Sequence, residues 1–166
     1  MSAMTDGISG VVKMKRVYLI YDAALGTEQM ARICPTAKAV GTTELKDYRL
    51  LFRGKHGTAT ASVEPMKGST VPAMLWDLSP ADEAALDRSV GCPAVCRKDT
   101  LTVAHSRKRV KATAYIMHEG CPLAAPSRYY YGLLLKGYRE HGFDERTLAT
   151  ALGASKKEVG SDDSND

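Results

Sequence analysis

Short apolar runs, separated by glycines and polar turns, cover most of the chain between residues 17 and 118. The first run, VYLIY at 17–21, is continuous and rich in strand-forming residues, which is typical of a buried strand. Later runs alternate apolar and polar side chains or end at turn residues, and this pattern also predicts strands. The predicted strands after the first are 37–52, 58–65, 70–78, 94–105 and 110–118, with bends marked by Gly54, Gly57 and Gly68.

Two helices are predicted between these strands from their start and stop signals. Residues 27–33 follow the first strand, with Thr27 as the expected capping residue. Residues 80–90 follow a capping Ser79 and have acidic residues in their first turn, where the helix dipole favours them. Gly91 is placed to end this second helix.

Two further helices are predicted after the strands. One is amphipathic and lies within 126–142, and the other begins at a capping Asp144 and ends before Gly153. Strands in a run, with helices inserted and grouped late, favour the α+β class. Because the continuous apolar strands need burial on both faces, we expect a mixed, partly closed β-barrel with flanking helices.

The length of 166 residues suits a single domain, which we place at residues 14–153. Residues 1–13 lack any periodic pattern and are expected to form a disordered N-terminal extension. Residues 154–166 are poor in apolar side chains and finish acidic, so they are expected to form a disordered tail.

The composition favours a cytoplasmic protein without a cofactor. No apolar run reaches the length of a membrane span, and the first residues do not have the pattern of a secretory signal. The net charge of +4 is densest at Arg107, Lys108 and Arg109, between two predicted strands. This run is interpreted as a solvated hairpin tip; a phosphate-contacting patch is the alternative, and a nucleic-acid partner is not expected.

Four cysteines are present: Cys34, Cys92, Cys96 and Cys121. Cys92 and Cys96 form C-x-x-x-C, which is not the C-x-x-C spacing of zinc or redox sites. Because no histidine or second pair completes a ligand set, no metal site is predicted. Reduced thiols are expected.

Three segments together resemble the gamma-glutamylcyclotransferase-like family. Residues 29–52, QMARICPTAKAVGTTELKDYRLLF, are similar to the family's Gln-Met-x-x-Arg-Cys-Pro pattern and its later Tyr-Arg-Leu-x-Phe. Residues 68–91, GSTVPAMLWDLSPADEAALDRSVG, resemble its Gly-x-x-Val-x-Gly-x-Leu-Trp and the Leu-Asp helix that follows. Residues 126–142, PSRYYYGLLLKGYREHG, match its closing pattern. The resemblance implies a mixed barrel with flanking helices.

The resemblance also implies a reaction. In this family the α-amine of a γ-glutamyl group attacks its own γ-carbonyl, which gives 5-oxoproline and a released amine. A Tyr-Gly-Ser-Asn-Leu loop offers backbone N–H groups to the glutamyl head, as an oxyanion hole would. A Glu in a Leu-Asp-x-x-Glu-Gly turn is the general acid/base, a role typically worth about 10²–10⁴-fold in rate.

This chain departs from the family at those functional positions. Its turn reads Leu-Asp-Arg-Ser-Val-Gly, so that Val90 stands in place of the Glu, and valine cannot transfer a proton. Cys96 stands where the family has its next tyrosine. The candidate ligand-binding residues, taken from the positions that match the family's pocket, are Tyr21, Asp22, Ala23, Ala24, Leu25, Val90, Cys96 and Tyr130.

Three accounts of Val90 stay open. In the first account, the pocket has closed and the valine packs in it. In the second, the pocket is remodelled and binds another ligand. In the third, cyclotransferase activity is retained through another residue. Asp22 is the candidate substitute, because burial beside Val90 would raise the pKa of its carboxyl. Asp87 is expected to be structural and Glu83 to face solvent.

Cys96 is either a nucleophile or, as we favour, a buried inert thiol, since no histidine can be placed beside it. The preferred interpretation of the whole chain is a noncatalytic or diverged member that binds a small, γ-glutamyl-like molecule or a protein partner. The alternative is an active cyclotransferase on γ-glutamyl amines or peptides. Nothing in the sequence predicts an oligomeric state.

Overall fold

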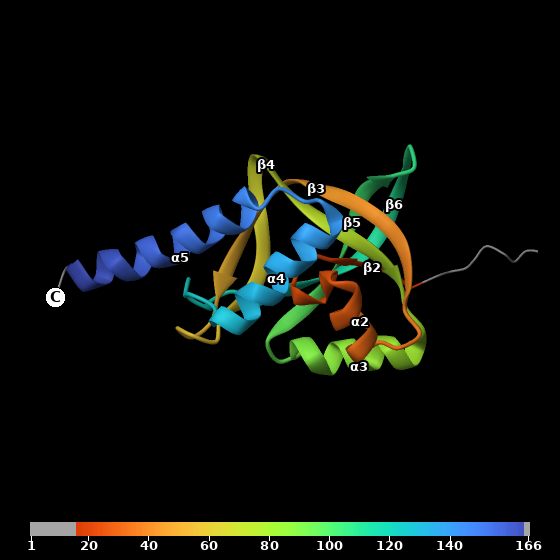
Figure 1. Ribbon diagram of the computed structural model, residues 1–166, viewed down its shortest axis with the longest axis horizontal. Coiled ribbons are helices and arrows are strands. Elements are labelled where there is room, and N and C mark those ends of the chain that lie inside the picture. The colour runs from red at the N-terminus through yellow and green to blue at the C-terminus, as the bar shows by residue number, and fades with distance from the viewer. Residues whose placement is uncertain (1–15, 165–166) are drawn as a thin grey trace, which may run out of the picture.

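A five-stranded sheet with the strand order β3-β4-β2-β6-β5 forms the centre of the protein (Figure 1). The computed structural model describes residues 16–164. The strands are β2 (Val17–Ile20), β3 (Lys38–Arg53), β4 (Thr60–Asp77), β5 (Cys96–His105) and β6 (Lys108–Met117). The short central strand β2 pairs antiparallel with β4, where Tyr18 lies opposite Trp76, and parallel with β6. The sheet is therefore mixed, and the predicted α+β class is confirmed.

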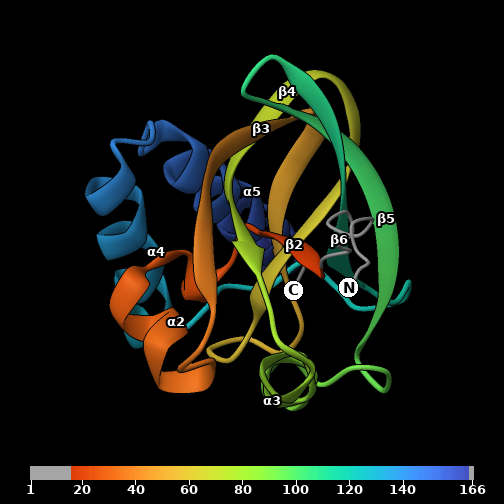
Figure 2. The same ribbon diagram turned by 90° about the vertical axis from the view of Figure 1, so that its right-hand side faces the viewer.

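The sheet curls so that its two edge strands, β3 and β5, approach each other (Figure 2). The Thr43 hydroxyl on β3 donates to the Ala104 carbonyl oxygen on β5 at 2.6 Å. Close by, a Cβ on Gly41 would lie 2.5 Å from a ring carbon of His105, so only glycine allows this approach. Within the described residues no ladder joins the two edges, so the sheet curls toward a barrel without closing.

The predicted strands 58–65 and 70–78 are one continuous strand, β4, and this part of the prediction was wrong. Gly68 does have a positive φ of 91°, but it lies in a bulge rather than at a chain reversal. Its N–H donates to the Asp47 carboxylate on β3 at 2.9 Å, and Asp47 itself has a φ of 65°. Both strands thus have a residue with positive φ at the bulge, and their pairing continues beyond it.

The helices are α2 (Thr27–Ile33), α3 (Pro80–Val90), α4 (Arg128–His141) and α5 (Arg146–Ser164), with a 3₁₀ turn, η1 (Ala23–Leu25), after β2. Ser79 caps α3 by accepting from the Asp82 N–H at 3.1 Å, and Gly91 ends it in the left-handed conformation, as predicted. Thr27 does not cap α2. The cap position belongs to Gly26, and the Thr27 N–H donates to Glu140 of α4 at 3.1 Å instead.

Helix α5 does not end before Gly153, as we expected, but continues to Ser164. Leu148, Ala151 and Ser155 are buried at helical spacing along one face of α5, which packs against β3. This packing carries the helix past a residue that would end it in isolation. The predicted extension at 1–13 lies outside the described residues, and the division of the chain into one domain and two tails stays a prediction.

The helices gather around the curled sheet (Figure 2). Helix α3 crosses one end of it, while α2 and α4 lie side by side against another part. The core between them is formed mainly by fully buried aliphatic and aromatic side chains, among them Leu19, Phe52, Leu75, Leu134 and Tyr138. Across residues 16–164, the helices are too short or too polar to cross a membrane.

Candidate functional site

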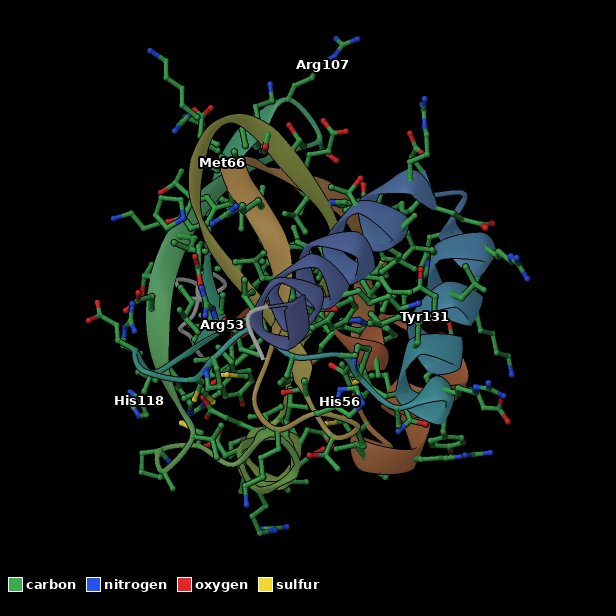
Figure 3. The ribbon with its side chains drawn as sticks, turned by 90° about the vertical axis from the view of Figure 1, so that its left-hand side faces the viewer. Arg53, His56, Met66, Arg107, His118 and Tyr131 are labelled. Atoms are coloured by element: carbon green, nitrogen blue, oxygen red, sulfur yellow. The ribbon has the colours of Figure 1, made fainter. Side chains whose placement is uncertain are left out.

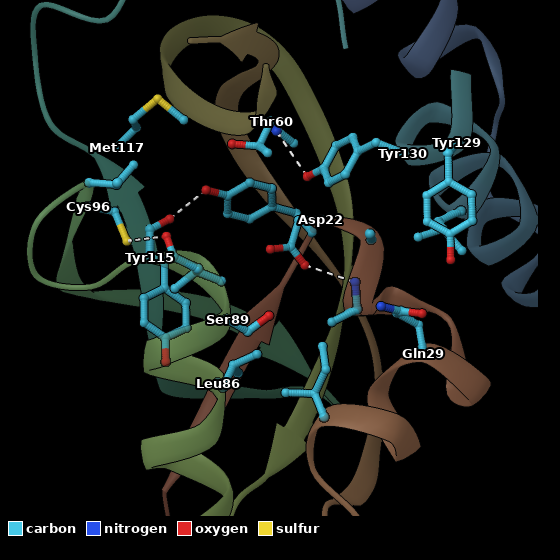
Figure 4. Close-up of a pocket in the computed structure, with 18 residues that line it drawn as sticks. Asp22, Gln29, Thr60, Leu86, Ser89, Cys96, Tyr115, Met117, Tyr129 and Tyr130 are labelled. Carbon is cyan, nitrogen blue, oxygen red and sulfur yellow. Dashed lines mark hydrogen bonds between the residues drawn. The ribbon is translucent and has the colours of Figure 1, made fainter. Parts of the chain in front are cut away.

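A cavity of about 350 Å³ opens between η1, α3, α4 and the ends of β5 and β6 (Figure 4). Its volume falls in the range of small-molecule sites, roughly 300–1,000 Å³. Seven of the eight candidate residues line it, namely Tyr21, Asp22, Ala23, Ala24, Val90, Cys96 and Tyr130. The eighth, Leu25, is fully buried outside the lining, and its carbonyl oxygen accepts from His141 Nε2 at 2.8 Å. The open cavity argues against the account in which the pocket has closed around Val90.

Asp22 holds the loop at the floor of this cavity. Residues 21–25 read Tyr-Asp-Ala-Ala-Leu, so that Asp22 stands where the resembling family loop has glycine. The Asp22 backbone is extended, with φ −95°, so this position does not require the positive φ that favours glycine. Its side-chain Oδ1 accepts from the Ala24 N–H at 3.0 Å, and its carbonyl oxygen accepts from the Leu25 N–H at 2.9 Å. Asp22 is therefore the cap of η1, and it uses N–H groups that the loop could otherwise offer to a ligand.

The carboxyl of Asp22 is half-buried and faces the cavity (Figure 4). Burial raises its pKa above the ordinary 3.8, and hydrogen bonds from the Ala24 N–H and its own N–H offset only part of that rise. The lining contains no lysine, arginine or histidine. An ionised Asp22 thus has no cationic side chain in the cavity to balance its charge.

Two tyrosines form fixed walls beside Asp22. The Tyr21 hydroxyl donates to the Tyr115 carbonyl oxygen at 2.5 Å, and the Tyr130 hydroxyl oxygen accepts from the Ala61 N–H at 3.0 Å. Burial raises the pKa of both phenols above the ordinary value. Both rings are consequently neutral and held by the backbone of the sheet.

Val90 and Cys96 form the opposite wall and supply no acid or base. Val90 is the last residue of α3, and its side chain is partly exposed to the cavity. The Cys96 thiol donates weakly to the Val90 carbonyl oxygen at 3.7 Å, and burial raises its pKa to about 12. A thiol with that pKa is protonated at neutral pH, which favours the inert interpretation over a nucleophile.

Asp87 and Glu83 attach α3 to the sheet. Asp87 accepts from the Tyr115 hydroxyl and pairs with Lys98 at 3.0 Å, so its expected structural role agrees with its contacts. Glu83 was expected to face solvent, but its side chain is only 25% exposed. It accepts from the Tyr18 hydroxyl and pairs with Lys98 at 3.3 Å, because α3 lies across β2 and β5 at this point.

Other lining residues were not predicted from the sequence, notably Gln29, Thr60, Ser89, Tyr115 and Tyr129. Ser89 carried a usable signal, since it lies three residues after Leu86 and next to Val90 on α3, and both of these also line the cavity. The sequence gives no such signal for Tyr115 and Thr60, because they reach the cavity only through the way β6 and β4 curl.

The basic run lies far from this cavity. Arg107 is at the tip of the β5–β6 hairpin and points away from the body of the protein (Figure 3). Among the side chains described, from residue 16 to residue 156, the histidine, cysteine and acidic groups do not form a cluster suited to a metal ion. The cysteines among these residues are free thiols.

Comparison with known proteins identifies the family. Residues 19–133 match the family described as gamma-glutamyl cyclotransferase, AIG2-like. This chain belongs to that family. The match covers more than half of the chain, and every residue that lines the cavity lies within it.

Solved structures share the fold of this chain. A protein described as gamma-glutamyl cyclotransferase superposes with a TM-score of 0.71 at 22% identity, over 86% of this chain and 85% of that one. The human uncharacterized protein loc79017 gives 0.72 at 21% identity, over 87% and 86%. YkqA from Bacillus subtilis gives 0.71 at 16% identity, over 85% of this chain and 55% of its own. At these identities the likeness shows the fold alone. Among curated proteins, none matches this chain significantly.

Proposed function

We propose that this chain is a diverged member of the family that binds a small molecule in the cavity and does not form 5-oxoproline. One observation carries the proposal: the cavity is open, while Val90 occupies the wall where the family resemblance places the acid/base.

The chemistry of cyclisation sets two requirements that this cavity meets poorly. A proton must leave the substrate ammonium and another must reach the departing amine, yet Val90 and the protonated Cys96 provide no such group at their wall. The glutamyl carboxylate must also find free N–H donors, but the Ala24 N–H is already bonded to Asp22. An ionised Asp22 would in addition repel that carboxylate.

The test is the release of 5-oxoproline from a γ-glutamyl amine and from a γ-glutamyl dipeptide, measured by mass spectrometry at high protein concentration. We expect no release above the protein-free rate. Release that scales with the concentration of the folded protein would overturn the proposal.

Retained cyclotransferase activity is the second candidate, and one observation favours it. Asp22 faces the cavity, and burial raises the pKa of its carboxyl toward the range that acid/base catalysis uses. In that case Asp22→Asn should lower turnover by about 10²–10⁴-fold. Turnover that is unchanged in Asp22→Asn would exclude this role.

The cytoplasmic location and a protein partner remain proposals from the sequence. Large apolar side chains are exposed at Val40, Met66, Val95 and Tyr129, which come from four different elements or loops. Of these, Val95 and Tyr129 line the cavity. This distribution favours a small ligand over a protein partner.

A further inference from the structure

We propose that the cavity selects a small amine cation that carries no carboxylate beside its amine, with Asp22 as the counter-ion. The inference rests on the proposed ligand-binding function and names the chemical class of its ligand. It follows from the charge of the cavity, from the state of its backbone donors and from the nature of its walls.

The charge of the cavity is unbalanced. Asp22 is the one carboxyl side chain among the lining residues, and the lining includes no basic side chain. A partly buried carboxylate that has no cation beside it is less favourable than one that pairs with a cation. A bound ammonium group would supply that cation and would donate hydrogen bonds to the side of the carboxylate that faces the cavity.

Two backbone donors of the loop are already occupied. The Ala24 N–H donates to Asp22 Oδ1 at 3.0 Å, and the Leu25 N–H donates to the Asp22 carbonyl oxygen at 2.9 Å. A ligand carboxylate would therefore meet a negative side chain, and the Ala24 and Leu25 N–H groups are already bonded within the turn. The Asp22 carboxylate thus accepts the Ala24 N–H hydrogen bond that an anionic ligand could otherwise accept.

The walls suit a cation with an apolar body. Tyr130 and Tyr129 come from consecutive positions of α4, and both line the cavity together with Tyr21 and Tyr115 (Figure 4). Tyrosine faces attract ammonium groups, by about 0.5–2 kcal/mol in general. Leu86 and Met117 add apolar surface for the rest of the ligand.

The experiment measures binding to the full chain by isothermal titration calorimetry, with four probes of similar shape: 2-phenylethylamine, 2-phenylethanol, 3-phenylpropionate and phenylalanine. We expect 2-phenylethylamine to bind at least tenfold more tightly than each of the others. Phenylalanine is the decisive comparison, because it carries the same amine with a carboxylate beside it. Equal or tighter binding of 3-phenylpropionate or phenylalanine, or no binding of 2-phenylethylamine, would overturn the inference.

Two variants locate the selectivity. Asp22→Asn removes the charge while its amide oxygen still caps the Ala24 N–H, and it should weaken 2-phenylethylamine binding by roughly 10- to 100-fold. Asp99→Asn changes an acid on β5 that is outside the cavity lining, and it should leave binding unchanged. Equal binding by the two variants would refute the role of Asp22. The 5-oxoproline assay is independent, so its outcome tests the proposed function separately.

Discussion

The replacement Asp22→Asn isolates the charge that dominates the cavity. The aspartate has a pKa above its ordinary value of 3.8 in the folded protein, because burial disfavours the ionised form. Asparagine has nearly the same shape and is an equally good helix cap, so the hydrogen bond from the Ala24 N–H should be kept. The two proteins should then differ chiefly by one ionisable group.

The sign of the effect follows from proton linkage. When the folded pKa lies above the unfolded pKa, the folded state binds the proton more tightly, and stability falls as pH rises through the interval between the two values. Each unit of that interval lowers the free energy of unfolding by about 1.4 kcal/mol. We therefore expect Asp22→Asn to match the wild type below pH 3.8 and to become more stable than it above the folded pKa.

The assay is urea unfolding of both proteins at a series of pH values between 3 and 8, followed by circular dichroism. In the difference between the two free energies of unfolding, the pH dependence of the titratable groups that both proteins share cancels. Asp22→Ala is the matched control: it also lacks the charge, but it loses the cap, which lowers stability by about 1 kcal/mol at every pH. A difference between the wild type and Asp22→Asn that stays constant with pH, or that falls as pH rises, would refute the reasoning.

Three further predictions concern the core around the site. Tyr138→Phe should leave the free energy of unfolding unchanged or raise it by up to about 1 kcal/mol, because the buried Tyr138 hydroxyl has no partner among the described residues. Tyr21→Phe should lower the free energy of unfolding by about 1 kcal/mol, because it removes the hydrogen bond to the Tyr115 carbonyl oxygen. Equal effects of the two substitutions in denaturant unfolding would contradict this. Gly137→Ala should destabilise by about 1–3 kcal/mol, since its Cβ would lie 3.1 Å from Leu25 Cβ, and an unchanged melting temperature would argue against it. Cys96 should resist iodoacetamide at pH 8 until the protein unfolds, because its pKa is about 12; rapid labelling of the native protein, detected by peptide mass spectrometry, would contradict that pKa.

Local signals in the sequence were sufficient to place most of the elements. Strand alternation and the capping residues Ser79 and Gly91 act within a few neighbouring residues, so they can be recognised without the fold. The errors occurred where distant contacts override such signals. Gly153 lies within α5 because the face around Ser155 is buried, and Gly68 lies within β4 because Asp47 of the paired strand accommodates the bulge.

The site could be predicted less completely than the fold. Sequence resemblance located Tyr21, Val90 and Tyr130 at the cavity, because these positions match known motifs. The resemblance could not show that the Asp22 side chain bonds the backbone of its own loop, since that depends on one rotamer and one turn geometry. It also could not reveal Tyr115, whose position follows from the pairing of β6 with β2.

Asp22 rather than Val90 is the more informative departure from the family. Valine at position 90 removes a proton-transferring group and leaves the rest of the cavity as it would be, which alone would describe a weakened enzyme. Under the proposed function, Asp22 would change what the cavity recognises, because its carboxylate faces the cavity and its side chain also bonds the Ala24 N–H. A site that has lost its catalyst need not alter its recognition. Because both positions differ from the family motif while an open space remains, the two departures together favour the proposed binding of a different ligand over a weakened enzyme.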